Sequence, residues 1–280
     1  MKLIVQIKKR IMSIVFLILA FLWIGPLLIV IMTAMKRTEE YISKSPLSLP
    51  ESIIPLFANM KAAWQLSGLG PSFENSLFYA ILGASIAIFL ASLAGYALTK
   101  LKIKGSFTIF MFIYAGTIFP FQLYLIPLYK MYNIFNIYDT KIGMLIFYIT
   151  ICIPFCLFVM RNYFTTIPNE VIEAARIDGA STFRIYRSIL MPMCISPVLT
   201  LFLFQSTWIW NDLLFGLMLS KSDNVRPVMP SLMLLSGTFG IGSEPQIMAG
   251  ALLASLFPLL IFLSLQRYFM AGLKLTTAGE

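Results

Sequence analysis

The sequence predicts an all-α membrane protein with six transmembrane helices. Of its 280 residues, 59% are hydrophobic, and the mean hydropathy is +0.86. A soluble domain is ordinarily about half apolar, so this excess indicates a chain that lies largely in lipid. A hydrocarbon core of ~30 Å requires about 20 apolar residues per helix. Six stretches without a charged residue approach or exceed that length: 11–35, 75–99, 105–129, 142–160, 188–211 and 246–266.

Prolines interrupt most of these stretches. A proline inside a lipid-embedded helix is tolerated where neighbouring helices or water satisfy the carbonyls that it frees. The pattern therefore favours a packed bundle around a pathway over isolated membrane anchors. The second stretch also has small residues at four-residue intervals, which let helices approach closely and are interpreted as packing positions. The prolines are Pro26, Pro120, Pro127, Pro154, Pro192, Pro197 and Pro258, and the small residues are Gly83, Ala87, Ala91 and Gly95.

The formal charge of +9 is interpreted as a topology signal rather than as a sign of nucleic acid binding. Lys and Arg concentrate in cytoplasmic loops. Four basic clusters fall on one side of a six-span chain, so both termini are expected in the cytoplasm, although 36–74 is also basic and fits the rule less well. The clusters are Lys2, Lys8, Lys9 and Arg10; Lys100, Lys102 and Lys104; Arg161, Arg176, Arg184 and Arg187; and Arg267 and Lys274.

The N-terminus and the cysteines suggest neither processing nor cross-linking. The stretch 11–35 is longer than the apolar region of about 7–15 residues in a cleavable signal peptide, so a retained first helix is expected. Cys152, Cys156 and Cys194 form no paired framework, so they are interpreted as small hydrophobic residues. No metal site is expected, because two thiols on one helix face lack further ligands.

A charged island between the fourth and fifth stretches, residues 161–190, is predicted to form a helix–turn–helix. Pro168 suits the first turn of a helix, and the acidic residues after it complement the helix dipole. Gly179 fits the left-handed position that ends a helix. Ser181 is expected to cap a second helix that runs towards Pro192. A polar helix held at the membrane surface can receive force from a soluble partner.

The island offers such a partner two kinds of surface. Ala174 and Ala175 leave a low-profile face around which a cleft can close. Ile172, Phe183 and Tyr186 are expected to serve as apolar anchors. The alternative is a plain cytoplasmic loop with no docking role.

The spacing of Glu173-Ala174-Ala175, Gly179, Ile189 and Pro192 resembles the EAA loop of importer permeases of the ATP-binding cassette (ABC) type. The words Ile-Pro-x-Glu at 167–170 and Asp-Gly-Ala-Ser at 178–181 are similar to those of permeases that import carbohydrates with a binding protein. Further similar phrases are Asn75-Ser76-Leu77, Pro120-Phe121-Gln122, Trp208-Ile209-Trp210-Asn211-Asp212 and Gln266-Arg267-Tyr268-Phe269. Met191 departs from the usual leucine but keeps its volume and apolarity. The likeness covers most of 73–272, whereas 1–72 match only in layout.

The resemblance implies a MetI-like type I ABC importer permease fold, similar to the second permease subunit of maltose-type systems. Residues 1–72 would hold the first helix and an extracytoplasmic segment, 73–272 the permease domain with its EAA loop at 161–190, and 273–280 a cytoplasmic tail. The segment 220–245 would probe the binding protein, and the tail from about 268 would approach the ATPase. Carried over for ATPase coupling are Glu170, Glu173, Ala174, Ala175, Asp178, Gly179, Ala180 and Pro192.

The resemblance also implies the partners and the location. They are a second homologous permease, a dimer of cytoplasmic ATPase subunits, an extracytoplasmic solute-binding protein and the lipid of a bacterial or archaeal cytoplasmic membrane. The chain lacks a Gly-x-x-x-x-Gly-Lys-Ser/Thr phosphate loop, so ATP and Mg²⁺ are expected on the ATPase subunits. No enzymatic activity and no cofactor are expected of this chain itself.

The expected solute is a sugar, most simply an oligosaccharide, whose passage needs hydroxyl partners and stacking faces. Asp212, at the outer end of the fifth stretch, is an intramembrane acid and so a functional hypothesis. Either it contacts sugar or it fixes a helix kink, and Asp212→Ala is expected to impair uptake. The candidate pathway residues are Gln122, Tyr124, Gln205, Ser206, Trp208, Asn211 and Asp212.

Three alternatives remain. A glycerol-phosphate or polyol importer of the same family is the nearest, although a phosphorylated solute would require basic residues that no stretch contains. An ion-coupled secondary transporter would use Asp212 as its coupling carboxylate, but it leaves the EAA spacing unexplained, and no inverted pair of broken helices is visible. An integral membrane enzyme is the third alternative, but the sequence contains no histidine, no metal-ligand cluster and no nucleophile motif.

Overall fold

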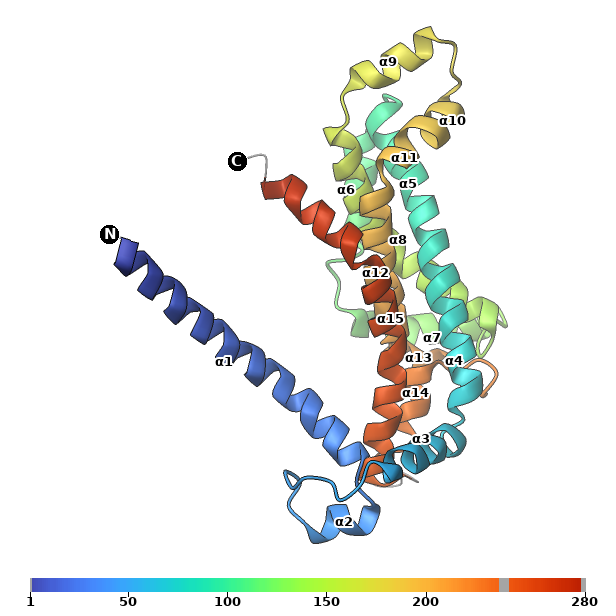
Figure 1. Ribbon diagram of the computed structural model, residues 1–280. Helices are drawn as coiled ribbons and strands as arrows, with labels where there is room; N and C mark the ends of the chain where they lie inside the picture. Colours follow the sequence, from blue (N-terminus) through green and yellow to red (C-terminus); the bar gives the residue numbers. More distant parts are fainter. Residues whose placement is uncertain (1, 237–241, 278–280) are drawn as a thin grey trace. The chain divides into compact units, whose positions relative to one another are not determined.

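The computed structural model describes residues 2–236 and 242–277, with side chains described for 9–236 and 242–267. Within that part of the chain every regular element is a helix, which confirms the predicted all-α class (Figure 1). The chain forms two compact units, described separately below. The first unit comprises Met1–Gly70 with Ser231–Leu256, and the core unit comprises Pro71–Pro230 with Phe257–Glu280.

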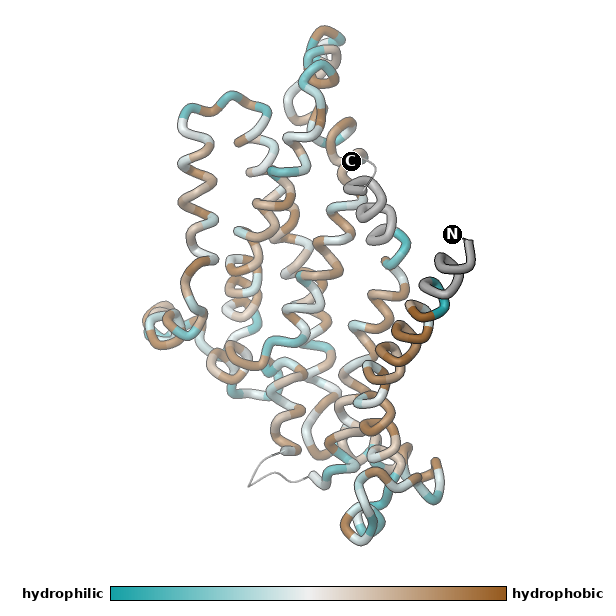
Figure 2. Tube along the Cα trace, turned by 90° about the vertical axis from the view of Figure 1, so that its left-hand side faces the viewer, coloured by the Kyte–Doolittle hydropathy of each residue, from teal (hydrophilic) through white to brown (hydrophobic). Residues whose placement is uncertain are grey.

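The first unit is built on a long apolar helix. Its apolar side chains stay exposed along most of its length, and Figure 2 shows it as a nearly continuous hydrophobic segment after Arg10. A helix that is hydrophobic all round and unburied by its own chain requires lipid or another protein around it. The helices of this unit are α1 (Lys2–Ala34), α2 (Thr38–Ser43), α3 (Ile54–Leu66) and the part of α15 (Glu244–Thr277) that ends at Leu256.

The basic residue that follows α1 is structural. Lys36 is fully buried, and its Nζ donates hydrogen bonds to the Ser45 and Pro46 carbonyls at 3.2 and 2.9 Å. Asn59 of α3 donates to the Ala34 and Lys36 carbonyls at the end of α1. A buried lysine is rare unless it is paired in this way. This role explains one of the basic residues by which 36–74 departs from the charge rule.

The core unit begins with α4, a π-helical turn and α5, which run on as one helix and pack along α8. The small residues at four-residue intervals are buried, as predicted. A Cβ on Gly95 would lie 3.2 Å from the backbone nitrogen of Arg161 in α8, so glycine at this position permits α5 and α8 to approach closely. The first elements are α4 (Leu69–Phe78), the π-turn Tyr79–Gly83, α5 (Ala84–Lys100), α6 (Ser106–Ala115), the 3₁₀ turn Phe121–Tyr124, α7 (Leu125–Ile134) and α8 (Lys141–Thr166).

The rest of the core unit carries the charged island and the helix that lines the cavity described below. In Figure 1, α9 and α10 lie at one end of this unit and α7 and α13 towards the other. The elements are α9 (Asn169–Ile177), α10 (Thr182–Ile185), the π-turn Tyr186–Leu190, α11 (Met191–Met193), α12 (Ile195–Trp210), α13 (Leu214–Leu219) and α14 (Val228–Met233), followed by the second part of α15.

Six uninterrupted spans are not what the structure shows. Among the described residues, four helices are long and apolar enough to cross a membrane: Lys9–Ala34, Leu69–Lys100, Lys141–Thr166 and Glu244–Arg267. The fifth stretch is bent by 75° between Met193 and Ile195. Pro197 cannot donate to the Met193 carbonyl four residues earlier. The Tyr163 hydroxyl donates to that oxygen instead, at 2.9 Å, so the bend is stabilised from α8.

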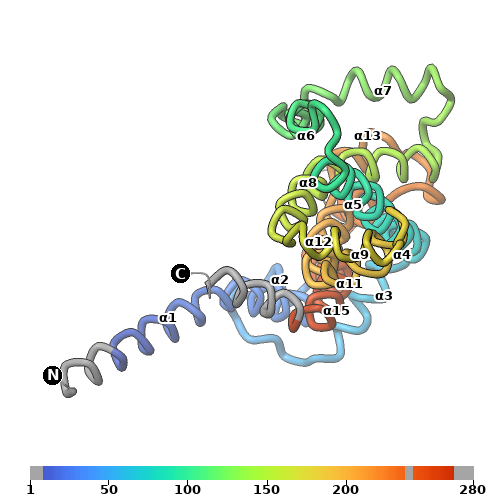
Figure 3. The backbone as a smooth tube through the Cα atoms, turned by 90° about the horizontal axis from the view of Figure 1, so that it is seen from above, coloured from blue at the N-terminus to red at the C-terminus, as the bar shows by residue number. Residues whose placement is uncertain are grey.

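The third stretch, 105–129, was predicted as one span, and in the structure it does not form one continuous helix. Its helix, α6, ends at Ala115 after ten residues, and α7 lies across the bundle (Figure 3). Pro120 prevents a continuous helix, and the backbone carbonyls that become free need other donors. The Tyr124 hydroxyl supplies them, donating to Gly116 O at 2.8 Å and Phe119 O at 3.2 Å.

Candidate functional site

The charged island folds as the predicted helix–turn–helix, and we call residues 167–190 the EAA hairpin. Gly179 has a φ of 76°, the left-handed conformation predicted to end α9. Its N–H donates to Arg176 O, and the next N–H, of Ala180, donates to Ala175 O. Ser181 caps α10 by accepting from the Arg184 N–H at 3.3 Å. Pro168 lies one residue before α9, at the N-cap, rather than inside its first turn as predicted.

The faces of α9 differ from the prediction. Ile172 and Ala175 are buried against the core unit, as is Tyr186 beyond the turn, so none of these three is free to contact a partner. Of the three predicted anchors, only Phe183 is exposed, at 60%. Ile177, which was not singled out, is 86% exposed. Five residues after Ile172, it falls on the opposite side of a helix with 3.6 residues per turn, so the two isoleucines could not both have been buried against the bundle.

Most of the remaining coupling candidates lie on α9 or in the turn that ends it, whereas Pro192 lies in α11. Ala174 keeps the predicted low-profile role, whereas Ala175 does not. Acidic side chains follow the helix from its first turn to its cap, where they are free to meet a cationic partner. Glu170, Glu173, Ala174, Asp178, Gly179 and Pro192 are exposed, and Ala180 is half-buried.

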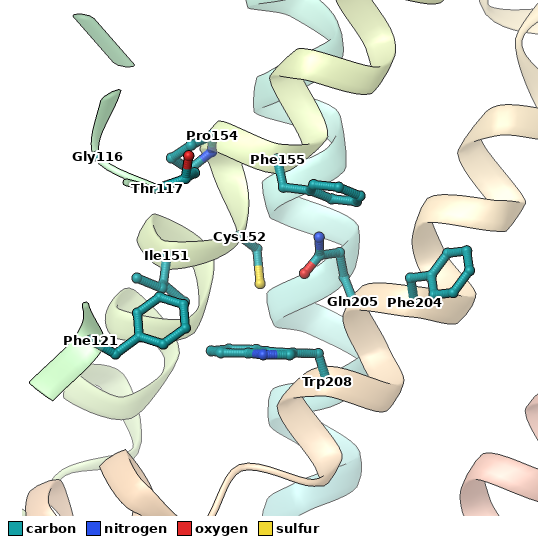
Figure 4. A pocket seen from close by; sticks show the side chains of 10 residues that line it. All are labelled: Gly116, Thr117, Phe121, Ile151, Cys152, Pro154, Phe155, Phe204, Gln205 and Trp208. Carbon is teal, nitrogen blue, oxygen red and sulfur yellow. The ribbon is translucent and has the colours of Figure 1, made fainter. Parts of the chain in front are cut away.

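A second feature is a cavity of about 410 Å³ within the core unit. It lies between α8, α12 and the connection that follows α6, and it is largely apolar. Gln205 is buried in its wall and makes no hydrogen bond to another described residue. Figure 4 shows its amide directed towards Cys152, with the Trp208 ring below it. Phe121 packs near Trp208 with ring centroids 6.2 Å apart, so aromatic faces and one free amide line the same space.

Only two of the predicted pathway residues, Gln205 and Trp208, line this cavity. Gln122 is exposed beside it, one residue after Phe121. Asn211 lines a neighbouring hollow of about 450 Å³ with Trp208. Tyr124 and Ser206 use their hydroxyls to bond backbone carbonyls of their own segments, which leaves them little capacity for solute.

Asp212 lies two residues beyond the end of α12 and is buried. Its Oδ2 accepts from the Tyr148 hydroxyl and from the Gly216 N–H, both at 2.9 Å, and its Oδ1 accepts from the Phe215 N–H at 3.3 Å. The carboxylate therefore caps the first turn of α13 and ties it to α8. Of the two interpretations offered for Asp212, this geometry supports the structural one.

The segment after α13 is held by hydrogen bonds to the connection between α7 and α8. Asp139, in the connection between α7 and α8, accepts from the N–H groups of Lys221 and Ser222 at 2.7 and 3.0 Å. Partial burial would raise the pKa of the Asp139 carboxyl, but these hydrogen bonds outweigh burial and lower the pKa below its usual value. The predicted outer segment 220–245 is thus anchored at its start, while 237–241 lie outside the described residues.

Metal binding finds no support in the described side chains, which contain no cluster of three His, Cys, Asp or Glu. The three cysteines are buried and free, and Cys152 reaches the cavity wall. The predicted C-terminal phrase at 266–269 and the tail from 268 lie almost wholly outside the described side chains.

The chain is similar to known proteins in sequence and in fold. Residues 87–274 match the family described as binding-protein-dependent transport system inner membrane component. The osmoprotective compounds uptake permease protein GgtD of Synechocystis is 29% identical over 274 residues, 95% of this chain and 91% of the relative. The probable starch degradation products transport system permease protein AmyC of Thermoanaerobacterium thermosulfurigenes is 32% identical over 278 residues, 98% of this chain and 96% of the relative.

A solved structure shares the fold. It is the crystal structure of a bacterial ABC transporter involved in the import of the acidic polysaccharide alginate. One of its chains matches with a TM-score of 0.78 at 21% identity, covering 94% of this chain and 97% of that chain. The MetI-like permease architecture implied by the EAA spacing is therefore the architecture found.

Proposed function

The chain belongs to the family of binding-protein-dependent transport system inner membrane components, and we propose on that premise that it forms half of the pathway of an ATP-driven sugar importer. Membership makes it a multi-pass membrane protein and a non-enzymatic permease subunit of an ABC importer, which works with an ATPase and a binding protein. Our proposal adds a second homologous permease, two ATPase subunits that hold ATP and Mg²⁺, and both termini in the cytoplasm of a bacterium or archaeon.

The EAA hairpin carries the coupling part of this proposal. Its exposed Ile177 and Phe183 give a soluble partner two apolar anchors, and exposed charged side chains of both signs, among them Glu173 and Arg184, lie on the same hairpin. Such an apolar patch with a polar rim is typical of a protein interaction site. Closure of the ATPase dimer on ATP would displace α9 and shift the bundle between two packed states, one open to each side of the membrane.

Gly179→Asp tests the coupling role, with Gly105→Asp as its matched control. Both glycines have positive φ, of 76° and 74°, and open surroundings, so both variants carry the same backbone strain and added charge. Only the first lies in the hairpin. In pull-downs from membranes, we expect Gly179→Asp to reduce association with the ATPase subunits about tenfold, equivalent to about 1.4 kcal/mol. Equal association and equal ATP-driven uptake in both variants would refute coupling through this hairpin.

The cavity supports a sugar as solute. Trp208 and Phe121 offer aromatic faces, and Gln205 offers an amide that can both donate and accept hydrogen bonds to hydroxyls. No Lys or Arg lines this cavity, which disfavours a phosphorylated solute such as glycerol phosphate. AmyC, a relative described as transporting starch degradation products, favours an oligosaccharide. GgtD, described as taking up osmoprotective compounds, keeps a small polyol as the second candidate.

Competition distinguishes these solutes. The reconstituted importer would take up labelled maltodextrin in the presence of unlabelled sorbitol or glycerol 3-phosphate. We expect unlabelled maltodextrin to compete and the other two to have no effect. Strong competition by sorbitol with no maltodextrin uptake would replace the oligosaccharide with a polyol.

A further inference from the structure

Three side chains at four-residue intervals on α5 contact both arms of the EAA hairpin. They are Ser92, Tyr96 and Lys100, which share one face of the helix. Most of α5 packs along α8 through apolar side chains. This row of polar side chains, at the end of α5 nearest the hairpin, makes hydrogen bonds instead. Each of its members bonds a residue of 167–190.

Lys100 holds the start of the first arm. Its Nζ donates to the Ile167 carbonyl at 2.6 Å and to Asn169 Oδ1 at 2.9 Å. These two acceptors lie on either side of Pro168, where the chain leaves α8 and enters α9. The side chain is buried, and a charged donor of this kind makes hydrogen bonds stronger than neutral ones.

Tyr96 and Ser92 hold the second arm. The Tyr96 hydroxyl donates to the Thr182 carbonyl at 3.2 Å, and its ring lies 5.6 Å from that of Tyr186. The Tyr186 hydroxyl is 2.7 Å from Ser92 Oγ, and both residues are buried. Tyr186 also begins a π-helical turn, a local irregularity that is frequent at functional sites.

These contacts matter because α9 has a break in the helix at each end. The backbone is extended at Pro168, and it is left-handed at Gly179. Apolar packing of Ile172 and Ala175 holds one face of α9 against the core unit, but the two breaks leave its ends without helical hydrogen bonds to the bundle. Lys100 bonds both sides of the first break, and Tyr96 and Ser92 bond the chain just after the second.

We propose that Ser92, Tyr96 and Lys100 are positioning residues that transmit displacement of the EAA hairpin to α5, and we call them the α5 strap. This inference rests on the proposed coupling function and adds a route that does not follow the covalent chain. Transmission between distant sites requires a physical element whose state both sites bias, and a helix bonded to both arms of the hairpin is such an element. Because α5 packs along α8, both helices would move together with α9.

The test combines Ser92→Ala, Tyr96→Phe and Lys100→Met in one strap variant. The matched control combines Tyr114→Phe and Lys104→Met, which remove a tyrosine hydroxyl and a lysine ammonium from residues without a hydrogen bond to the hairpin among the described side chains. Each would be purified with its own partner permease, ATPase and binding protein and placed in liposomes. The measurements are retention of the ATPase subunits and ATP hydrolysis with and without the binding protein.

We expect the strap variant to retain the ATPase but to lose about tenfold in stimulation by the binding protein, within the usual range of coupling between sites. The control should behave as wild type. Lys100→Arg, which keeps the cationic donor, should restore stimulation when it replaces Lys100→Met. Because methionine keeps most of the length of lysine, a loss that arginine reverses is a loss of the cationic donor.

A direct distance measurement separates the remaining outcomes. Spin labels at exposed Phe89 on α5 and exposed Arg184 on α10 should keep one narrow distance with and without ATP in wild type, and this distance should broaden with ATP in the strap variant. If the full variant fails to insert, the isosteric Tyr96→Phe alone takes its place. Unchanged stimulation and an unchanged narrow distance would overturn the strap. Failure of the coupling function itself would show separately, as normal ATPase association in Gly179→Asp.

Discussion

Replacing Asp212 with alanine is expected to cost more in stability than in affinity for solute. The change removes three hydrogen bonds to a buried carboxylate, from Tyr148, Phe215 and Gly216. Each hydrogen bond to a charged group contributes about 1.5–3 kcal/mol, and a buried hydroxyl left without a partner costs about 1–3 kcal/mol. Since the charge is also no longer buried, part of this loss is offset. We expect the free energy of unfolding to fall by about 3–5 kcal/mol.

Two milder variants show how much each hydrogen bond contributes to the fall in the free energy of unfolding. Asp212→Asn keeps an oxygen that can replace Oδ2, but turns an amide N–H towards the Phe215 N–H, so about 1–2 kcal/mol is expected. Tyr148→Phe removes only one donor, at about 1 kcal/mol. The double variant should be less destabilised than the sum of the two by about 1 kcal/mol, because the residues share a hydrogen bond.

Thermal unfolding of the purified complex and initial uptake rates over a range of solute concentrations measure the two effects separately. Asp212→Ala should lower Tm by about 10 °C, at about 2–4 °C per kcal/mol for a chain of this size. Asp212→Asn should leave KM close to that of wild type. The structural assignment would be refuted by an unchanged Tm together with a large rise in KM, which is the result expected of a sugar contact.

Three further perturbations test other parts of the structure. Gly143→Ala would place a Cβ in steric clash with the Ile137 carbonyl oxygen and is expected to reduce the yield of folded protein. Gly25→Ala, with nothing within 4 Å of the added Cβ, should leave expression and Tm unchanged. Asp139→Asn should lower Tm at neutral pH. The pKa of Asp139 is lowered in the folded protein, so the carboxylate stops stabilising the fold as pH falls below the ordinary value of 3.8 and through the folded-state pKa. The difference in Tm between variant and wild type should therefore shrink only in that acidic range. A small thiol reagent should modify Cys152, at the cavity wall, more slowly when solute is bound. The fully buried Cys156 should stay unmodified with or without solute. Equal modification rates for the two cysteines would contradict a solute-filled cavity.

Local chemistry made the EAA hairpin predictable. The left-handed position of Gly179 and the cap at Ser181 depend on residues within a few positions of each, so the sequence contains their causes. The same holds for the small residues of α5, since their spacing alone places them on one face. What the pattern could not assign was which face of α9 meets the bundle, because Ile172 and Ile177 are equally apolar and only tertiary packing distinguishes them.

The misplaced features depend on partners far apart in the chain. Asp212 was recognisable as an unusual acid, but its main partner, Tyr148, lies 64 residues earlier. The third stretch was predicted as one helix because Pro120 was taken as tolerated inside it, and the structure interrupts the helix before that residue. Whether a proline bends or ends a helix depends on which donors reach the freed carbonyls. The Tyr163 hydroxyl donates to the Met193 carbonyl at the bend in the fifth stretch, and the helix continues after the bend. The Tyr124 hydroxyl donates to the Gly116 carbonyl in the third stretch, where the helix has ended.

One helix of the core unit links the two ends at which partners are proposed to act. Leu69–Lys100 has 32 residues and so spans about 48 Å. At one end, Asn75 and Tyr79 donate to carbonyls of the segment 223–226, at 2.9–3.1 Å. At the other end, the strap holds the EAA hairpin. A displacement that the ATPase gives to α9 would therefore reach the segment proposed to face the binding protein through a single helix, without passing through the bent fifth span. This geometry favours a movement in which α5 carries the signal between the two ends of the core unit.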